Sequence, residues 1–150
     1  MTNANSTITF PCGVTMKNRF MLAPLTNQQS HENGELSNDE LKWLTMRAEG
    51  EFGLVMTCAS HVQKVGKGFP GQLGIFSDSL NAGHIKLTTN IKELGSLAVI
   101  QLHHAGMRTP SELINVNPVC PSNNEETGAT NTTPFPNASL VIDSWLSLIV

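Results

Sequence analysis

The 150-residue sequence contains no tyrosine, few charges and no long apolar run. Tyrosine is a common proton donor in enzymes, so its absence leaves the proton donor of any catalysed reaction unidentified. No run approaches the roughly 18 apolar residues of a membrane-spanning helix. The N-terminus also lacks the basic and apolar segments of a signal peptide. The sequence therefore predicts a cytoplasmic protein with no membrane partner.

An excess of positive charge and paired cysteines are lacking as well. The net charge is -3 with scattered Lys and Arg, which gives no electrostatic reason to expect nucleic acid. Cys12, Cys58 and Cys120 form no CxxC pair, so we expect reduced thiols and no thiolate zinc site. His103 and His104 are adjacent, and neighbours on an extended segment point opposite ways. We therefore predict no metal site.

The chain does contain apolar strands that alternate with helical patterns. Strands are predicted over residues 19–23 and 52–59 and from residue 97 onwards; helices are predicted after Ser37, which opens a capping box, and after Ser77. Non-alternating apolar strands of this kind indicate a parallel sheet covered by helices. A short hairpin is expected over residues 7–16. Residues 63–74, rich in glycine, and 110–137, rich in proline, are predicted to be loops, the first of them mobile and on the surface.

The strand spacing suits either a doubly wound sheet or a (β/α)₈ barrel. The first strand is followed by Ala-Pro-Leu-Thr-Asn-Gln-Gln and not by the Gly-x-Gly-x-x-Gly of a dinucleotide-binding fold, so the barrel is favoured. Parallel strands bring Thr26, Ala59 and Gln101 to one edge of the sheet. Their hydroxyl, backbone and amide groups suit a planar heterocycle. The alternative is that each polar residue only satisfies backbone at a strand end.

Four ordered motifs resemble the opening third of the Old Yellow Enzyme family of FMN-dependent NADH:flavin oxidoreductases, or ene-reductases. The motifs occupy residues 17–26, 47–55, 74–78 and 101–108, within a resemblance over about residues 7–128. The resemblance implies an α/β fold, the N-terminal portion of a (β/α)₈ TIM barrel with a β-hairpin capping its bottom.

The resemblance also implies a flavin site on the same strand ends. The segment of Ala23, Pro24, Leu25 and Thr26 would lie along the FMN, with the Thr26 position hydrogen-bonding near the flavin O4 and N5 edge. The Ala59 position would offer backbone groups, and Gln101 would contact the pyrimidine edge. In the family reaction, NADH or NADPH reduces FMN, and the flavin passes a hydride to a small-molecule substrate, an activated alkene.

Other family features have no counterpart in these residues. The His-x-x-His or His-x-x-Asn pair that holds the substrate after the fourth strand is missing, as are the phosphate-binding loops after strands seven and eight. The catalytic residues are therefore unknown. We expect residues 1–129 to form strands one to three of the barrel. Residues 130–150 are expected to be a divergent tail, non-native in a truncated or frame-altered product.

These features support three hypotheses. The chain is part of an FMN-dependent oxidoreductase and is inactive by itself, with weak FMN affinity, poor stability or aggregation. Alternatively, it is a non-catalytic half-barrel that assembles with a complementary segment or as a homo-oligomer. A third hypothesis is a small complete α/β domain with an unrelated ligand. Flavin absorbance separates the first two, and a sharp cooperative unfolding transition would favour the third.

Overall fold

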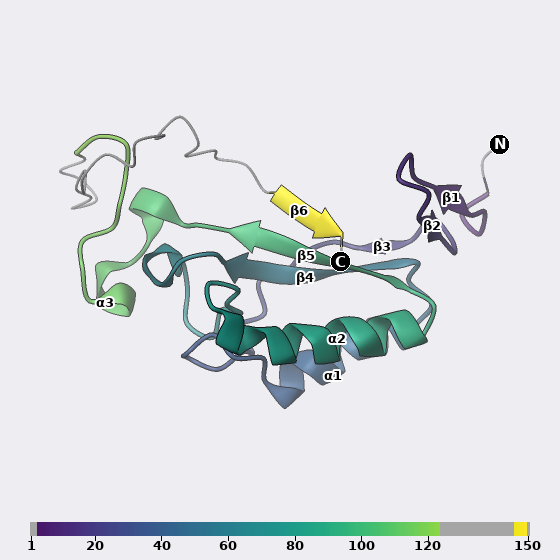
Figure 1. The fold of residues 1–150 in the computed structure, drawn as a ribbon, viewed down its shortest axis with the longest axis horizontal. Helices are drawn as coiled ribbons and strands as arrows, with labels where there is room; N and C mark the ends of the chain where they lie inside the picture. Colours follow the sequence, from purple (N-terminus) through teal and green to yellow (C-terminus); the bar gives the residue numbers. More distant parts are fainter. Residues whose placement is uncertain (1–2, 124–145, 150) are drawn as a thin grey trace.

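The structure is a computed structural model that describes residues 3–123 and 146–149 (Figure 1). Its strands are β1 (Ile8–Thr9), β2 (Thr15–Met16), β3 (Met21–Leu22), β4 (Leu54–His61), β5 (Leu97–His103) and β6 (Leu146–Ile149). Its α-helices are α1 (Asn38–Glu49), α2 (Asn81–Glu93) and the single turn α3 (Ser111–Ile114). Short 3₁₀ turns cover Lys64–Gly66, Asp78–Leu80 and Gly106–Arg108.

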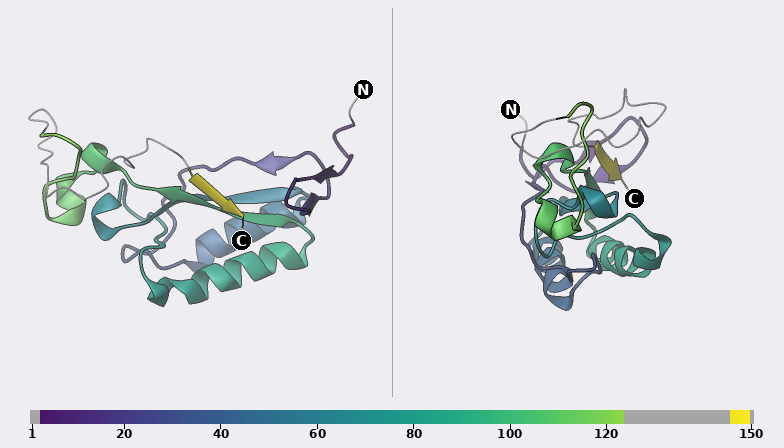
Figure 2. Two further views of the ribbon diagram at one scale, coloured as in Figure 1. Left: turned by 45° about the horizontal axis from the view of Figure 1, so that its top comes forward. Right: turned by 90° about the vertical axis from the view of Figure 1, so that its left-hand side faces the viewer.

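The central sheet has the order β3-β4-β5-β6. Strands β3, β4 and β5 are parallel to one another, and β6 pairs with β5 in the antiparallel direction. Helices α1 and α2 both lie against one face of this sheet, as the two views of Figure 2 show. Three parallel strands joined through helices on one face are the N-terminal portion of the (β/α)₈ barrel that the sequence predicts. The remainder of the predicted tail before β6 lies outside the described residues.

A two-stranded antiparallel hairpin, β1–β2, closes the end of the sheet at which the parallel strands begin (Figure 1). Met16 of the hairpin is buried in a cluster with Leu54 and Val99, and Ile8 and Phe10 pack against that cluster. The predicted hairpin is therefore confirmed, and its apolar residues cover the bottom of the barrel segment.

The main core lies between the sheet and the two helices. Its buried members come from β3, α1, β4, α2 and β5: Leu22, Leu44, Ala48, Val55, Leu87, Ile91 and Ala98. Leu44 and Ala48 are buried residues of α1, and Leu87 and Ile91 are buried residues of α2. Leu94, which caps the end of α2, is 36% exposed and lies outside this core.

Helix α1 begins where the capping signal predicts. The Ser37 hydroxyl accepts a hydrogen bond from the Glu40 N–H at 3.0 Å, which satisfies one of the free amides of the first turn. The other half of the predicted capping box does not form, because the Glu40 carboxylate accepts a hydrogen bond from the Ser30 hydroxyl. Helix α2 starts at Asn81, after a 3₁₀ turn, so its predicted start at Ser77 was slightly early.

The strand limits differ from the predicted ones at both ends of β4. The second strand was predicted over 52–59 but runs from Leu54 to His61. It continues because His61 donates its N–H to Leu73 O and accepts at its carbonyl from Ile75 N–H. Strand β3 is shorter than predicted and stops two residues before Pro24, which has no N–H to donate.

The glycine-rich loop is not a mobile surface loop as predicted, but a packed one. Gly66, Lys67 and Gln72 are buried. A Cβ at Gly66 would lie only 2.5 Å from the His104 Cδ2, so glycine is required for this close approach. The prediction failed because loop composition does not reveal packing between distant segments. Likewise, Pro110 precedes the turn α3 inside a stretch predicted to lack structure. Within the described ranges, every helix is too short or too polar to cross a lipid bilayer.

Candidate flavin-contacting face

Strand register places Ala59 and Gln101 side by side. The two residues are register partners in the β4–β5 ladder. Gln101 lies two residues after Val99, which packs on the side away from the helical core, so Gln101 belongs to the same face by strand alternation. The structure thus brings together two of the predicted contact residues on the sheet face opposite α1 and α2.

A β-bulge creates this pairing. Met56 pairs with Val99 and Ala59 pairs with Gln101, so β4 has one residue more than β5 over this stretch. Without the extra residue, Cys58 would lie opposite Gln101. The buried Thr57 stabilises the irregularity, because its hydroxyl accepts the Gln101 N–H at 3.2 Å and donates to Cys58 O at 2.8 Å. The bulge therefore puts the small Ala59 side chain beside the Gln101 amide.

Gln101 is only 5% exposed, and its backbone N–H is held by the Thr57 hydroxyl. A primary amide offers two donors and one acceptor oxygen. Such a group matches the alternating carbonyl and N–H groups along the edge of a heterocycle. The buried Gln101 and the small Ala59 paired with it are the features of this structure that fit a flavin ring.

The predicted segment from Ala23 to Thr26 continues directly after β3. Met21 is in register with Leu54, so Ala23 follows on the same face as Ala59 and Gln101. Pro24 is half-buried, whereas Leu25 and Thr26 are exposed. These residues extend beyond the β3–β4 pairing, and no register pair places the Thr26 hydroxyl beside Gln101.

Gln72 is a site residue that the sequence analysis missed. Its side chain is fully buried and bridges three segments of chain. Its oxygen accepts the Gly68 N–H at 2.7 Å, and its nitrogen donates to Ala59 O at 2.9 Å and to His103 Nδ1 at 3.1 Å. A glutamine among loop glycines has no periodic or motif signal, so only the tertiary structure reveals its contacts.

The histidines near these strand ends are held in a neutral form. Burial lowers the pKa of His61, His103 and His104, with neighbouring positive charges adding to the effect for the first two. The His104 Nδ1 accepts the Gly106 N–H at 2.9 Å, and its Nε2 lies 3.2 Å from Gln63 Oε1. In the part of the chain that the structure describes, no three His, Cys, Asp or Glu side chains are grouped so as to hold a metal.

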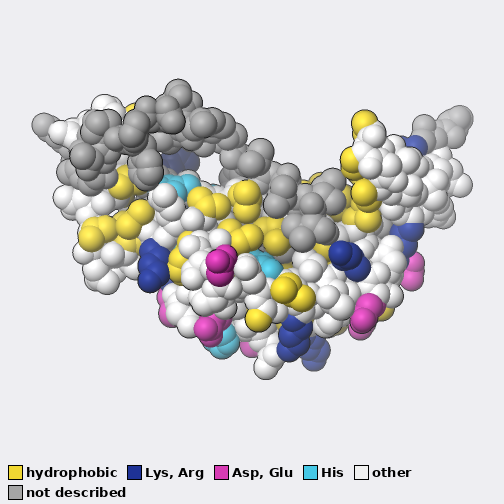
Figure 3. Space-filling model, in the orientation of Figure 1, with side chains coloured by type: hydrophobic (Ala, Val, Ile, Leu, Met, Phe, Trp, Pro, Cys, Tyr) yellow, Lys and Arg dark blue, Asp and Glu magenta, His cyan; other side chains and the backbone are white. Residues whose placement is uncertain are grey.

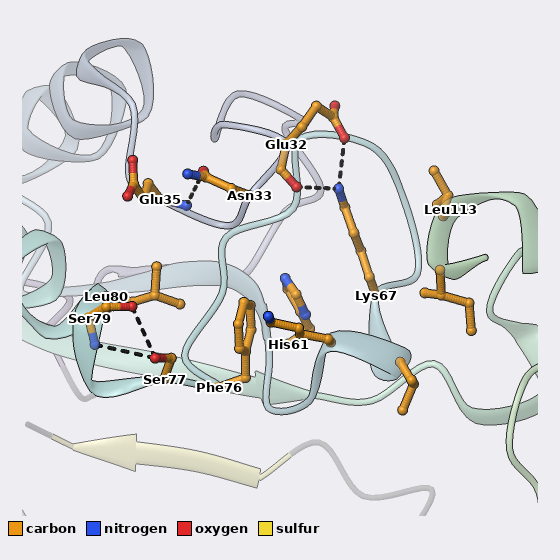
Figure 4. Close-up of a pocket in the computed structure, with 13 residues that line it drawn as sticks. Glu32, Asn33, Glu35, His61, Lys67, Phe76, Ser77, Ser79, Leu80 and Leu113 are labelled. Atoms are coloured by element: carbon orange, nitrogen blue, oxygen red, sulfur yellow. Dashed lines mark hydrogen bonds and ion pairs between the residues drawn. The ribbon is translucent and has the colours of Figure 1, made fainter. Parts of the chain in front are cut away.

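A cavity of about 450 Å³ lies beside the carboxyl end of β4 (Figure 4). His61 and Phe76 lie next to each other in its wall, with ring centroids 4.8 Å apart. Lys67 crosses the cavity to form an ion pair of 2.7 Å with Glu32 and donates to the Glu32 carbonyl at 2.8 Å. None of the six predicted flavin-contacting residues lines this cavity. Its cation–anion pair is already formed, so it is not the predicted site.

Cys58 is buried on the helix side of β4. Burial raises the pKa of its thiol to about 12, and the nearby Glu40 carboxylate raises it further. The reactive form of cysteine is the thiolate, which is therefore suppressed at neutral pH. The opposite face offers backbone groups, the Gln101 amide and the His103 imidazole.

Comparison with known proteins points to flavin enzymes. A family model described as the NADH:flavin oxidoreductase / NADH oxidase family matches residues 8–142, which is beyond the limit of residue 129 that we predicted. The probable NADH-dependent flavin oxidoreductase YqiG of Bacillus subtilis (strain 168) is 43% identical over 106 residues, which are 71% of this chain and 28% of that protein. NADH:acrylate oxidoreductase of Vibrio harveyi is 37% identical over 99 residues, 66% of this chain and 10% of that protein.

Among solved structures, the old yellow enzyme homologue from Zymomonas mobilis matches with a TM-score of 0.75 and 28% identity. The match covers 82% of this chain and 34% of that one. The chain therefore spans less than a third of the length of the two curated relatives above.

Proposed function

The chain belongs to the NADH:flavin oxidoreductase / NADH oxidase family, and from this premise we propose that the face formed by Ala23, Ala59 and Gln101 contacts the isoalloxazine ring of FMN. The observation that carries the proposal is the pair of Ala59 and Gln101. The bulge in β4 pairs the small residue Ala59 with the buried Gln101. Gln101 would then hold the pyrimidine edge, while Ala23 and Ala59 leave space for a planar ring.

Bound FMN would supply hydride transfer from NADH or NADPH to an activated alkene. The name of the Vibrio harveyi relative, NADH:acrylate oxidoreductase, supports this substrate class, because acrylate carries such an alkene. In this chain, the segment of Pro24, Leu25 and Thr26 would border the ring, with the Thr26 hydroxyl available for hydrogen bonding. Buried Gln101 would orient the ring through directional hydrogen bonds, which fixes its register on the sheet.

We further propose that this chain by itself is inactive and binds FMN weakly. The described part contains three of the eight parallel strands of a barrel. Phosphate sites in such barrels lie in the loops after strands seven and eight, so the contacts proposed here reach only the ring. A cytoplasmic location is part of the same proposal, which the three unpaired cysteines support.

A second candidate function is a non-catalytic half-barrel that assembles with a complementary segment or with a second copy. Met21, in the edge strand β3, is 48% exposed, and Leu25, which follows that strand, is 54% exposed. Hydrophobic side chains are visible on the surface along the strands (Figure 3). An exposed edge with apolar neighbours favours pairing with another strand.

An absorbance titration of the full chain with FMN tests the first candidate. We expect a saturable change in the flavin spectrum, and the variant Gln101→Leu should lower the affinity by about 3- to 10-fold, as loss of a neutral hydrogen bond does. Gln63→Leu is the matched control, because Gln63 is an exposed glutamine outside the proposed face. Absence of a spectral change, or equal affinities of the wild type and Gln101→Leu, would contradict the proposal. Enone reduction by the chain alone would contradict its proposed inactivity.

A further inference from the structure

The amide of Gln72 is oriented by its own hydrogen bonds. Gly68 donates its N–H to Gln72 Oε1 at 2.7 Å, so the oxygen must face the glycine-rich loop. The nitrogen then faces the sheet with two hydrogens. One hydrogen is directed to Ala59 O at 2.9 Å, and the other to His103 Nδ1 at 3.1 Å. The oxygen and both N–H hydrogens of this fully buried amide therefore each take part in a hydrogen bond.

This arrangement dictates where the proton of His103 resides. The amide nitrogen can only donate, so the His103 Nδ1 must be an acceptor without a hydrogen. A neutral imidazole with a bare Nδ1 carries its single proton on Nε2. A protonated imidazole would direct a second N–H at the amide hydrogens and would break the bridge.

We propose that Gln72 is a positioning residue that holds His103 neutral, with its proton on Nε2, on the sheet face that carries Gln101. His103 lies two residues after Gln101 in β5, so the two belong to the same face. The functional meaning of this face rests on the function proposed above. The bridge also spans β4 and β5, because the same amide binds Ala59 O.

Other groups around His103 also favour its neutral form over the cation. Burial lowers the pKa of His103, and two neighbours lower it further: His104, which follows β5, and His61 on β4. From the glycine-rich loop, Gly68 faces the ring without a charge; a Cβ there would lie 3.1 Å from the His103 Cε1. Burial, His104 and His61 thus disfavour the cation, and Gln72 selects the tautomer.

The first test needs no flavin. In the full chain, ¹⁵N NMR of the imidazole rings should show His103 with an unprotonated Nδ1 and a protonated Nε2 at neutral pH; the variant His103→Asn assigns the signal. A protonated Nδ1 would overturn the proposal. Because FMN is absent from the sample, this result is independent of whether the chain binds flavin.

The second test replaces the Gln72 amide, which donates a hydrogen bond to His103 Nδ1, by a group that can only accept one. In Gln72→Glu, the carboxylate can still accept from Gly68 but cannot donate, so the His103 Nδ1 must supply a proton. We expect the His103 pKa to rise by about 1 to 2 pH units beside the new negative charge. Gln63→Glu is the control, since Gln63 contacts His104 instead, and it should leave the His103 tautomer unchanged. A folded Gln72→Glu protein with an unchanged His103 pKa would overturn the proposal.

Discussion

Glu40 shows how one buried carboxyl group ties several segments together. It has no exposed surface, and the Ser30 hydroxyl donates to its Oε2. Cys58 of β4 and His84 of α2 also face it. Its other oxygen has no hydrogen-bond partner among the described residues. Burial raises the pKa of Glu40 more strongly than these hydrogen bonds lower it. The neutral acid is therefore the form that suits this site.

The raised pKa of Glu40 predicts a pH effect on stability. A carboxyl whose folded-state pKa exceeds its unfolded value of about 4.5 stabilises the fold at low pH and loses this contribution as the pH rises through the folded-state pKa. Glu40→Gln keeps an uncharged amide there. The free energy of unfolding of this variant relative to wild type should increase between pH 4.5 and pH 8 in urea denaturation. Glu49→Gln, an exposed position on the same helix, should show no such trend. A pH-independent difference for Glu40→Gln would contradict this assignment.

Single residues differ in how far the sequence could predict them. The position of Gln101 towards the end of a strand was predictable because it follows an apolar run. The role of Ser37 as a helix cap was predictable because it precedes a carboxylate by three residues. Gln72 and the Glu40–Ser30 contact were not predictable, since both depend on loops folding back onto the sheet. The flavin-contacting roles of Ala23, Pro24, Leu25, Thr26, Ala59 and Gln101 stay predictions.

At the scale of elements, the packing of the glycine-rich loop (residues 63–74) is the main feature that the structure shows and the sequence did not predict. Its backbone packs against His103 and His104 at the carboxyl end of β5, and Ala105 donates its N–H to Gly66 O at 3.0 Å. The strands and helices themselves were predicted from apolar runs and capping residues. The bulge in β4 was not, because an extra residue in one strand has meaning only relative to its partner.

Substitution of Gly66 tests this packing. In Gly66→Ala, the new Cβ would approach the His104 ring within 2.5 Å, so the ring or the loop must move. We expect a loss of about 1 to 3 kcal/mol in the free energy of unfolding, as in other overpacked sites. Gly50→Ala is the control, because Gly50 has a negative φ of -74° that alanine tolerates. If urea denaturation gives equal stabilities for the two variants, the loop is not packed as described.

At the scale of the whole molecule, one face of the sheet is covered by α1 and α2, and the hairpin packs against the other face at the end where the parallel strands begin (Figure 2). The parallel order and the hairpin cap were both predicted from the sequence. The antiparallel strand β6 beside β5 was not, because the last residues carry no turn or capping signal that fixes their partner. The boundary near residue 129 stays a prediction.

The exposed apolar side chains at the edge strand β3, Met21 in it and Leu25 after it, predict self-association of the chain. Sedimentation velocity of the full chain should show a weight-average mass that grows with concentration. Met21→Lys should reduce this growth, because a charge on an edge strand opposes pairing. Ile85→Lys is the control, since Ile85 is even more exposed, at 64%, but lies on α2. A monomer at all concentrations would argue against the half-barrel candidate.

The central claim is that the strand ends around Gln101 contact a flavin, and a residue-resolved FMN titration by ¹H–¹⁵N NMR tests it most directly. The account predicts saturable shifts at the backbone amides of Thr26 and Ala59 and at the side-chain NH₂ of Gln101. Shifts confined to the cavity beside His61 and Phe76, or no shifts at millimolar FMN, would contradict it.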